Sequence, residues 1–251
     1  MTRRSFFSTF LFLILGLWAI PALAGDSPGT SADIARGRAI FNRSCIFCHG
    51  AQGQGDGPAA FFIASYGAPR PQNFTGGQFK CRSTPSGAFP TDLDLFRTLT
   101  EGIPGFMPSF AGLTEQERWQ VISYLKGFHP KFRQPIPAPI EIGPPFPSSP
   151  ESISRGRQLY REAGCVECHG EGGRGDGEKA DTLQDYRGLS IPAADVTNLT
   201  SFKCGNTPVD IYRGILTGLN GTPMPSYQEA FPGGDQEIWH LVNYILSLSK
   251  R

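Results

Sequence analysis

Apolar residues recur at the spacing of amphipathic helices in six stretches of the chain, three in each half. The first predicted helix starts near residue 31 and runs into Cys45, and the third follows Thr114 and reaches Leu125. The other four are Thr91–Thr100, Ile153–Tyr160, Val209–Leu216 and Gln236–Leu248. No stretch alternates apolar and polar residues as a half-buried β-strand does. The pattern therefore predicts an all-α protein.

Polar residues of the capping type stand where these helices are expected to begin. Ser31 or Asp33 is the expected N-cap of the first helix, and Thr114 is that of the third. Asp92 and Asp94 fall in the first turn of the second helix, where carboxylates face the positive end of the helix dipole. The chain also contains 31 glycines and 22 prolines, which predict long loops. Few helices and long loops leave a thin core, so another group must fill it.

The two halves of the chain follow one plan. The first half contains ARGRAIFNRSCIFCHG, GDG, QFKCRSTP, GFMPSF and ERWQVISYLKGF. The second half contains SRGRQLYREAGCVECHG, GDG, SFKCGNTP, TPMPSY and EIWHLVNYILSL. Because the order is identical throughout, the chain is a tandem duplication. We expect one domain over residues 25–132 and another over residues 151–251.

A proline-rich segment, residues 133–150, joins the two predicted domains. Seven of its 18 residues are proline, and such linkers are extended, semi-rigid spacers. Four apolar residues interrupt the prolines: Ile136, Ile140, Ile142 and Phe146. They predict that the linker lies along a domain surface.

Residues 1–24 have the features of a secretory signal peptide. Two arginines precede an apolar run, and the small-residue site Ala22-Leu23-Ala24 follows it. The alternative, an uncleaved anchor, is less favoured because the apolar run is short for a membrane span. We therefore predict export with cleavage after Ala24, and a soluble mature protein because no second long apolar run follows.

Six cysteines are present, four of them in two CxxCH motifs. The motifs consist of Cys45, Cys48 and His49, and of Cys165, Cys168 and His169. A thioredoxin-like CxxC would need a βαβ pattern, a structural zinc site needs four ligands, and a disulfide does not explain the histidine. CxxCH is the attachment sequence of c-type heme, in which the cysteines bind the vinyl groups and the histidine binds the iron. The sequence predicts two covalently attached hemes c.

With these motifs the chain resembles a tandem class I c-type cytochrome, a diheme periplasmic electron carrier. The resemblance covers residues 31–132 and 151–250. It implies an N-terminal helix that ends in CxxCH, a methionine ligand in a loop, and a C-terminal helix that crosses the first. The residues matching this crossing are Gly37 and Phe41 with Tyr124, and Gly156 and Tyr160 with Tyr244.

The sixth iron ligand is predicted to be Met107 in the first domain and Met224 in the second. Each lies in an M-P-S-[FY] motif in a loop, and only Met1 of the signal peptide remains besides them. The competing ligands, His129 and His240, have no counterparts in the other repeat and are expected on the surface or in the linker. Thioether ligation favours Fe(II), so both hemes are expected to have positive potentials.

Further residues are assigned around the hemes with less specific signals. The carbonyl group of Pro69 or Pro192 is expected to accept the N–H of the histidine ligand, as a proline does in the family. The two GDG segments are expected to be tight turns without a chemical role. The pattern favours lining of the heme pocket over a docking rim for four aromatic residues: Phe61, Phe62, Phe74 and Phe79.

Cys81 and Cys204 occupy the same place in the F-K-C-x-x-T-P segment of each repeat. They are either two separate thiols or an inter-domain disulfide. The disulfide requires the domains to face each other across a pseudo-two-fold axis, on which equivalent residues meet.

The predicted function is single-electron transfer between periplasmic or membrane-bound redox proteins, without catalysis or a small-molecule substrate. A formal net charge of +1 without a basic run excludes nucleic acid as an expected partner. One alternative is a heme subunit held permanently in a larger oxidoreductase complex. Another is a diheme peroxidase, which would need an open iron site that the two methionine motifs argue against.

Overall fold

The computed structural model describes residues 29–64 and 69–249, so the predicted signal peptide lies outside the described residues. Within these ranges the chain is helical, and its β structure is limited to two isolated bridges. The α-helices are α1 (Ser31–Ser44), α2 (Ile46–His49), α3 (Pro58–Ala64), α4 (Asp92–Glu101), α5 (Glu115–Leu125), α6 (Pro150–Glu162), α7 (Cys165–His169), α8 (Pro208–Thr217) and α9 (Asp235–Leu248). Four 3-10 helices accompany them: Lys126–Phe128, Pro130–Arg133, Ala180–Thr182 and Leu199–Ser201. The all-α prediction is confirmed.

The helix starts follow the capping residues, with one correction. The N-cap of α1 is Thr30, and neither Ser31 nor Asp33 takes this place. Thr30 Oγ1 accepts the N–H of Asp33 at 3.2 Å while the Asp33 carboxylate accepts the N–H of Thr30, so Asp33 completes a capping box from the third helical position. The predicted cap Thr114 is confirmed, and α6 starts before the expected Ile153 because Ser149 caps it.

In each half the N-terminal helix crosses the C-terminal helix at a glycine. Helix α1 packs against α5, and α6 packs against α9. A Cβ atom on Gly37 would overlap the carbonyl oxygen of Gln120, and one on Gly156 would overlap that of His240. The predicted aromatic pairs meet beside these crossings, with ring centroids 5.3 Å apart in both Phe41–Tyr124 and Tyr160–Tyr244.

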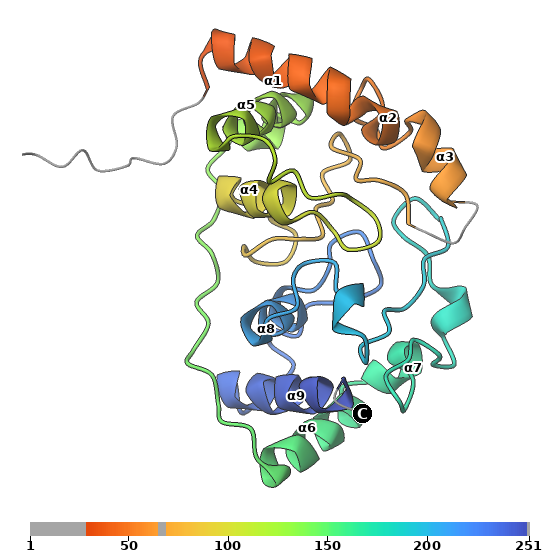
Figure 1. The fold of residues 1–251 in the computed structure, drawn as a ribbon. Coiled ribbons are helices and arrows are strands. Elements are labelled where there is room, and N and C mark those ends of the chain that lie inside the picture. Colours follow the sequence, from red (N-terminus) through yellow and green to blue (C-terminus); the bar gives the residue numbers. More distant parts are fainter. Residues whose placement is uncertain (1–28, 65–68, 250–251) are drawn as a thin grey trace, which may run out of the picture.

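Each half has a separate hydrophobic core around its helix crossing. The first is centred on Phe41, Val121 and Ile122, and the second includes the fully buried Tyr212 and Trp239. Figure 1 shows α1–α5 grouped in one part of the molecule and α6–α9 in the other. The two repeats therefore fold as two helical units.

The proline-rich linker runs extended along one side of both units, from α5 to α6 (Figure 1). Its apolar side chains pack as predicted: Ile136 against the first core, and Ile140, Ile142 and Phe146 against the second. Polar contacts add to this packing, since Trp239 Nε1 donates to the carbonyl oxygen of Gly143 at 3.3 Å.

In residues 29–64 and 69–249 no helix is both long and apolar enough to cross a membrane.

Candidate functional site

Both CxxCH motifs occupy a short helical turn that the following GDG segment holds in place. In the first half the N–H groups of Gly55 and Gly57 donate to the carbonyl oxygens of His49 and Cys48, at 2.9 and 3.2 Å. The second half repeats both bonds, from Gly175 to His169 and from Gly177 to Cys168, at the same distances. The GDG segments were expected only to turn the chain. They also satisfy the last carbonyl groups of the CxxCH turn.

Each CxxCH histidine is oriented by a backbone carbonyl group. The Nδ1 atom of His49 lies 3.0 Å from the carbonyl oxygen of Gln72, and that of His169 lies 2.8 Å from that of Ala194. A carbonyl oxygen only accepts, so Nδ1 carries the proton and Nε2 keeps its lone pair for a metal. Burial lowers the pKa of both imidazoles, against the effect of these hydrogen bonds, and favours the neutral form that ligates.

The predicted acceptors, Pro69 and Pro192, were therefore wrong. In both loops the acceptor lies further along the chain, at Gln72 and Ala194. The reason is geometric: a hydrogen bond requires a carbonyl group aimed at Nδ1, and the path of the loop sets this aim. Nothing in the residue type of the acceptor signals it, because every residue has a carbonyl group.

The four cysteines of the CxxCH motifs take part in no disulfide, whereas Cys81 and Cys204 are joined. Burial raises the pKa of Cys45 and of Cys165 to about 11. Among the described residues, no group of three or more His, Cys, Asp and Glu side chains is arranged to hold a metal ion.

One cavity of about 180 Å³ in the second half brings the predicted site residues together. Cys165, Cys168 and His169 line it from the CxxCH turn, and Met224 lines it from a loop later in the chain. The rest of the wall is mostly apolar and includes Ile191, Val196, Phe202, Ile211, Ile215 and Leu241. Two thiols, an imidazole and a thioether in one apolar cavity match the donor set and the surroundings that a covalent heme c requires.

Both predicted methionine ligands lie in tightly closed loops and are half-buried. The backbone groups of Ile103 and Met107 exchange two hydrogen bonds of 2.8 and 2.9 Å. In the second half the N–H of Leu219 donates to the carbonyl oxygen of Met224 at 3.1 Å, and the N–H of Met224 donates to Thr222 Oγ1 at 3.2 Å. Met107 packs against the first core, as its position in the repeat requires.

The competing histidines have other contacts. The ring of His129 packs against that of Phe89, and its Nδ1 accepts the N–H of Lys131 at 3.1 Å. His240 Nδ1 lies 2.8 Å from Ser152 Oγ, and its ring contacts Phe146. Both side chains stabilise local structure.

The four phenylalanines divide into two pairs. Phe74 and Phe79 are buried in the first core, and the Phe74 ring stacks on that of His49 with centroids 4.6 Å apart. Phe61 and Phe62 are 56 % and 65 % exposed, so the prediction that they line a pocket was wrong for this pair. They lie on the short helix α3, which Pro58 starts after the GDG turn and which presents both rings outward.

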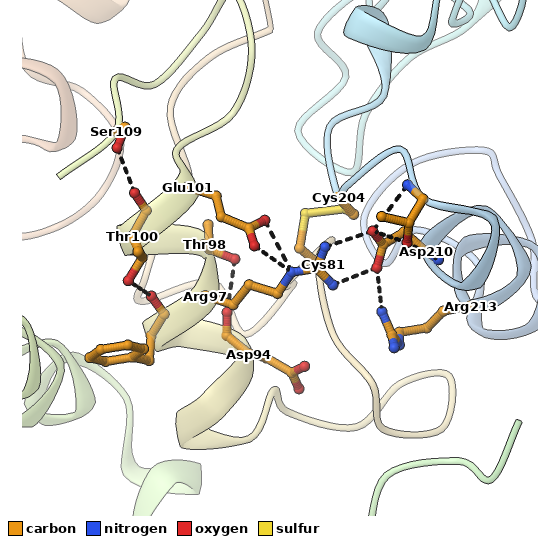
Figure 2. Close-up of polar contacts among 12 residues, drawn as sticks. Cys81, Asp94, Arg97, Thr98, Thr100, Glu101, Ser109, Cys204, Asp210 and Arg213 are labelled. Carbon is orange, nitrogen blue, oxygen red and sulfur yellow. Dashed lines mark hydrogen bonds and ion pairs between the residues drawn. A yellow bond between two sulfur atoms is a disulfide. The ribbon is translucent and has the colours of Figure 1, made fainter. Parts of the chain in front are cut away.

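Cys81 and Cys204 form a disulfide between the two halves, with Cα atoms 5.1 Å apart (Figure 2). This confirms the bridge over the alternative of separate thiols. Beside it, the Arg97 side chain of α4 reaches the Asp210 carboxylate of α8 with two bonds of 2.5 and 2.7 Å. Arg213 binds the same carboxylate from within α8, at 2.8 Å. Equivalent segments of the repeats thus meet at the interface.

Comparisons with known proteins agree with this arrangement. A family model described as cytochrome c oxidase, cbb3-type, subunit III matches residues 32–125, and a cytochrome c model matches residues 153–249. A chain of the Kuenenia stuttgartiensis reducing HAO-like protein complex superposes with a TM-score of 0.79 and 39 % sequence identity, covering 85 % of this chain and 95 % of that chain. No curated protein matches significantly.

The fold, the two family models and the similar chain of the protein complex define the class as c-type cytochromes. The chain belongs to this family as two cytochrome c domains in tandem, and such domains carry electrons on covalently bound heme c. Sequence reasoning missed the carbonyl groups of Gln72 and Ala194 within the site.

Proposed function

We propose that this protein carries single electrons through two hemes c, one in each domain. The proposed attachment residues are Cys45, Cys48, Cys165 and Cys168, and the proposed iron ligands are His49, Met107, His169 and Met224. The observation that carries this proposal is the apolar cavity shared by Cys165, Cys168, His169 and Met224.

Heme iron supplies the one-electron chemistry, and the chain controls where this chemistry takes place. The Ala194 carbonyl group holds the His169 ring with its Nε2 free for the iron. The apolar wall excludes water and disfavours the additional charge of Fe(III), as thioether ligation does. These features favour a positive potential and a closed iron site, which suits a carrier better than a peroxidase.

The disulfide and the Arg97–Asp210 ion pair favour electron transfer between the two proposed hemes. Both contacts join the domains, and the sulfur–sulfur bond is covalent. Domains held in a constant relation keep a constant distance between the hemes, so an electron accepted in one domain has a fixed path to the other.

The proposed location is the bacterial periplasm, with residues 1–24 as a cleaved signal peptide and domains at residues 25–132 and 151–251. The proposed partners are periplasmic or membrane-bound redox proteins.

A second candidate function is that of a permanent heme subunit, favoured by the 39 % identical chain of a protein complex. Purification of the untagged protein from its native cells separates the two, since a subunit elutes with stoichiometric partners and a free carrier elutes alone.

Optical and EPR spectra of the oxidised protein test the proposed ligation. We expect two low-spin hemes per chain, the weak red absorption band of methionine-bound ferric heme, and no rapid binding of cyanide. Met224→Ala should convert one heme to a high-spin form that binds cyanide. His240→Ala is the matched control and should leave both hemes low-spin. A wild-type heme that binds cyanide rapidly would contradict the proposal and favour the peroxidase.

A further inference from the structure

A buried arginine of the first domain binds backbone carbonyl groups of the second domain. Arg82 follows Cys81 directly and is 3 % exposed. Its Nη2 donates to the carbonyl oxygen of Thr217 at 2.5 Å, and its Nη1 donates to that of Gly218 at 3.2 Å. Its Nε donates to Pro85 in its own loop at 3.3 Å. The guanidinium group thus connects two domains through carbonyl groups alone.

The two bound carbonyl groups lie at the base of the loop that carries Met224. Thr217 is the last residue of α8, and Gly218 ends that helix with a φ of 66°. The loop closes directly after it, where Leu219 donates to the Met224 carbonyl group. A cation at this helix end is also favoured by the helix dipole. Arg82 therefore holds the segment from which the methionine loop starts.

A second contact joins the same two segments. The Oδ1 of Asn220 accepts the N–H of Gly87 at 3.2 Å, and its Nδ2 donates to the carbonyl oxygen of Ala88 at 3.4 Å. Residues 82–88 of the first domain therefore contact residues 217–220 of the second at several points. The loop of Met224 is not supported by its own domain alone.

The first domain holds the methionine loop of the second domain through this contact, but the second domain makes no equivalent contact in return, because the repeats differ at this position. Arg82 in K-C-R-S-T-P corresponds to Gly205 in K-C-G-N-T-P. Gly205 has a φ of 100°, and an added Cβ atom would overlap the Arg97 guanidinium and the Asp210 carboxylate. The glycine leaves room for that ion pair and has no side chain with which to reach the loop of Met107.

We propose that Arg82 is a positioning residue for Met224, through which the first domain sets the reduction potential of the second heme. The inference rests on the proposed His/Met ligation. A loop held at its base keeps the thioether on the iron, and this ligand favours Fe(II). The buried positive charge acts in the same direction, because it disfavours the additional charge of Fe(III). Both effects raise the potential of the second heme above that of an unsupported site.

Redox titration and imidazole binding to the oxidised full-length protein test this inference, with Arg82→Gln as the main variant. One midpoint potential should fall while the other stays unchanged, and imidazole should bind one ferric heme about tenfold faster or more. Met224→His, which moves the potential of its own heme, assigns the affected heme to the second domain. Compared with Arg82→Gln, Arg82→Lys should recover part of the lost midpoint potential, because it keeps the positive charge. It should not recover the slow imidazole binding, because an ammonium group lacks the planar guanidinium geometry that donates to both carbonyl groups.

Arg155→Gln is the control, since it removes the ion pair of an arginine with Glu237 in the second domain but leaves the loop of Met224 and the cavity wall untouched. It should change neither readout. If Arg82→Gln does not mature with two hemes, Arg82→Lys keeps the test open, because it retains the buried charge and should still speed imidazole binding. Unchanged potential and imidazole rate in Arg82→Gln, or an unchanged imidazole rate in Arg82→Lys used in its place, would overturn the inference. Absence of the methionine band from the wild-type spectrum would instead overturn the proposed ligation itself.

Discussion

At the scale of single residues, the helix crossings depend on two glycines. Gly37 and Gly156 lie where a neighbouring backbone carbonyl group takes the space of a side chain. The resemblance to class I c-type cytochromes indicated both, because a glycine of that family lets the C-terminal helix approach the N-terminal helix at this crossing. By contrast, nothing in the sequence indicated that Gln72 and Ala194 would orient the histidines, since each acts through its backbone.

Replacement of Gly156 by alanine should lower the free energy of unfolding by about 3 kcal/mol, because the added methyl group meets the backbone of α9 and must push the helices apart. Denaturant unfolding of the heme-loaded protein measures this change. Gly127→Ala is the control: an added Cβ atom there has no neighbour within 4 Å, so its effect should be small or stabilising. Equal losses in both variants would contradict the role of the crossing.

At the scale of elements, threonine caps define where the helices begin. Thr91 caps α4 with a capping box, in which its Oγ1 accepts the N–H of Asp94 at 3.1 Å and its N–H donates to the Asp94 carboxylate at 2.9 Å. Thr114 and Thr207 repeat the arrangement at α5 and α8. The signal is local in sequence, which is why the middle helices were predicted to within a residue or two.

Thr91→Ala should reduce stability by about 1 kcal/mol, because it removes the acceptor for one unpaired N–H of the first turn. Thermal and denaturant unfolding measure the loss. Thr91→Ser retains a hydroxyl group and should recover most of it. A serine variant as unstable as the alanine variant would show that packing of the threonine methyl group, and not the cap, stabilises α4.

At the scale of the whole molecule, the two domains are joined by a disulfide, an ion pair and a buried arginine. Asp210 receives Arg97 from the first domain and Arg213 from its own helix. Burial alone would raise the pKa of Asp210, but hydrogen bonds from Arg97 and Thr207 outweigh it and hold the pKa at about 2. The ionised carboxylate therefore belongs to the folded, docked state.

This lowered pKa predicts an acid-sensitive interface. Above the ordinary pKa of 3.8 the stabilisation is complete, and it is lost as the pH falls through about 2, because the unfolded chain binds the proton more readily. The loss should be about 1–2 kcal/mol, reduced by the partial exposure of Arg97. Denaturant unfolding at several pH values measures it. Asp210→Asn should lower the free energy of unfolding at neutral pH and should make it fall less steeply across this window than in the wild type. A pH profile parallel to that of the wild type would contradict the assignment.

The sequence by itself determined the helical plan, the duplication and the class of protein, because caps, helical periodicity and CxxCH motifs are encoded over a few neighbouring residues. Only the tertiary structure decided which carbonyl groups orient the histidines, that Phe61 and Phe62 stay exposed, and that Cys81 meets Cys204. It also decided that Arg82 reaches the loop of Met224. These contacts join residues far apart in the chain, and their geometry depends on how two folded domains pack together.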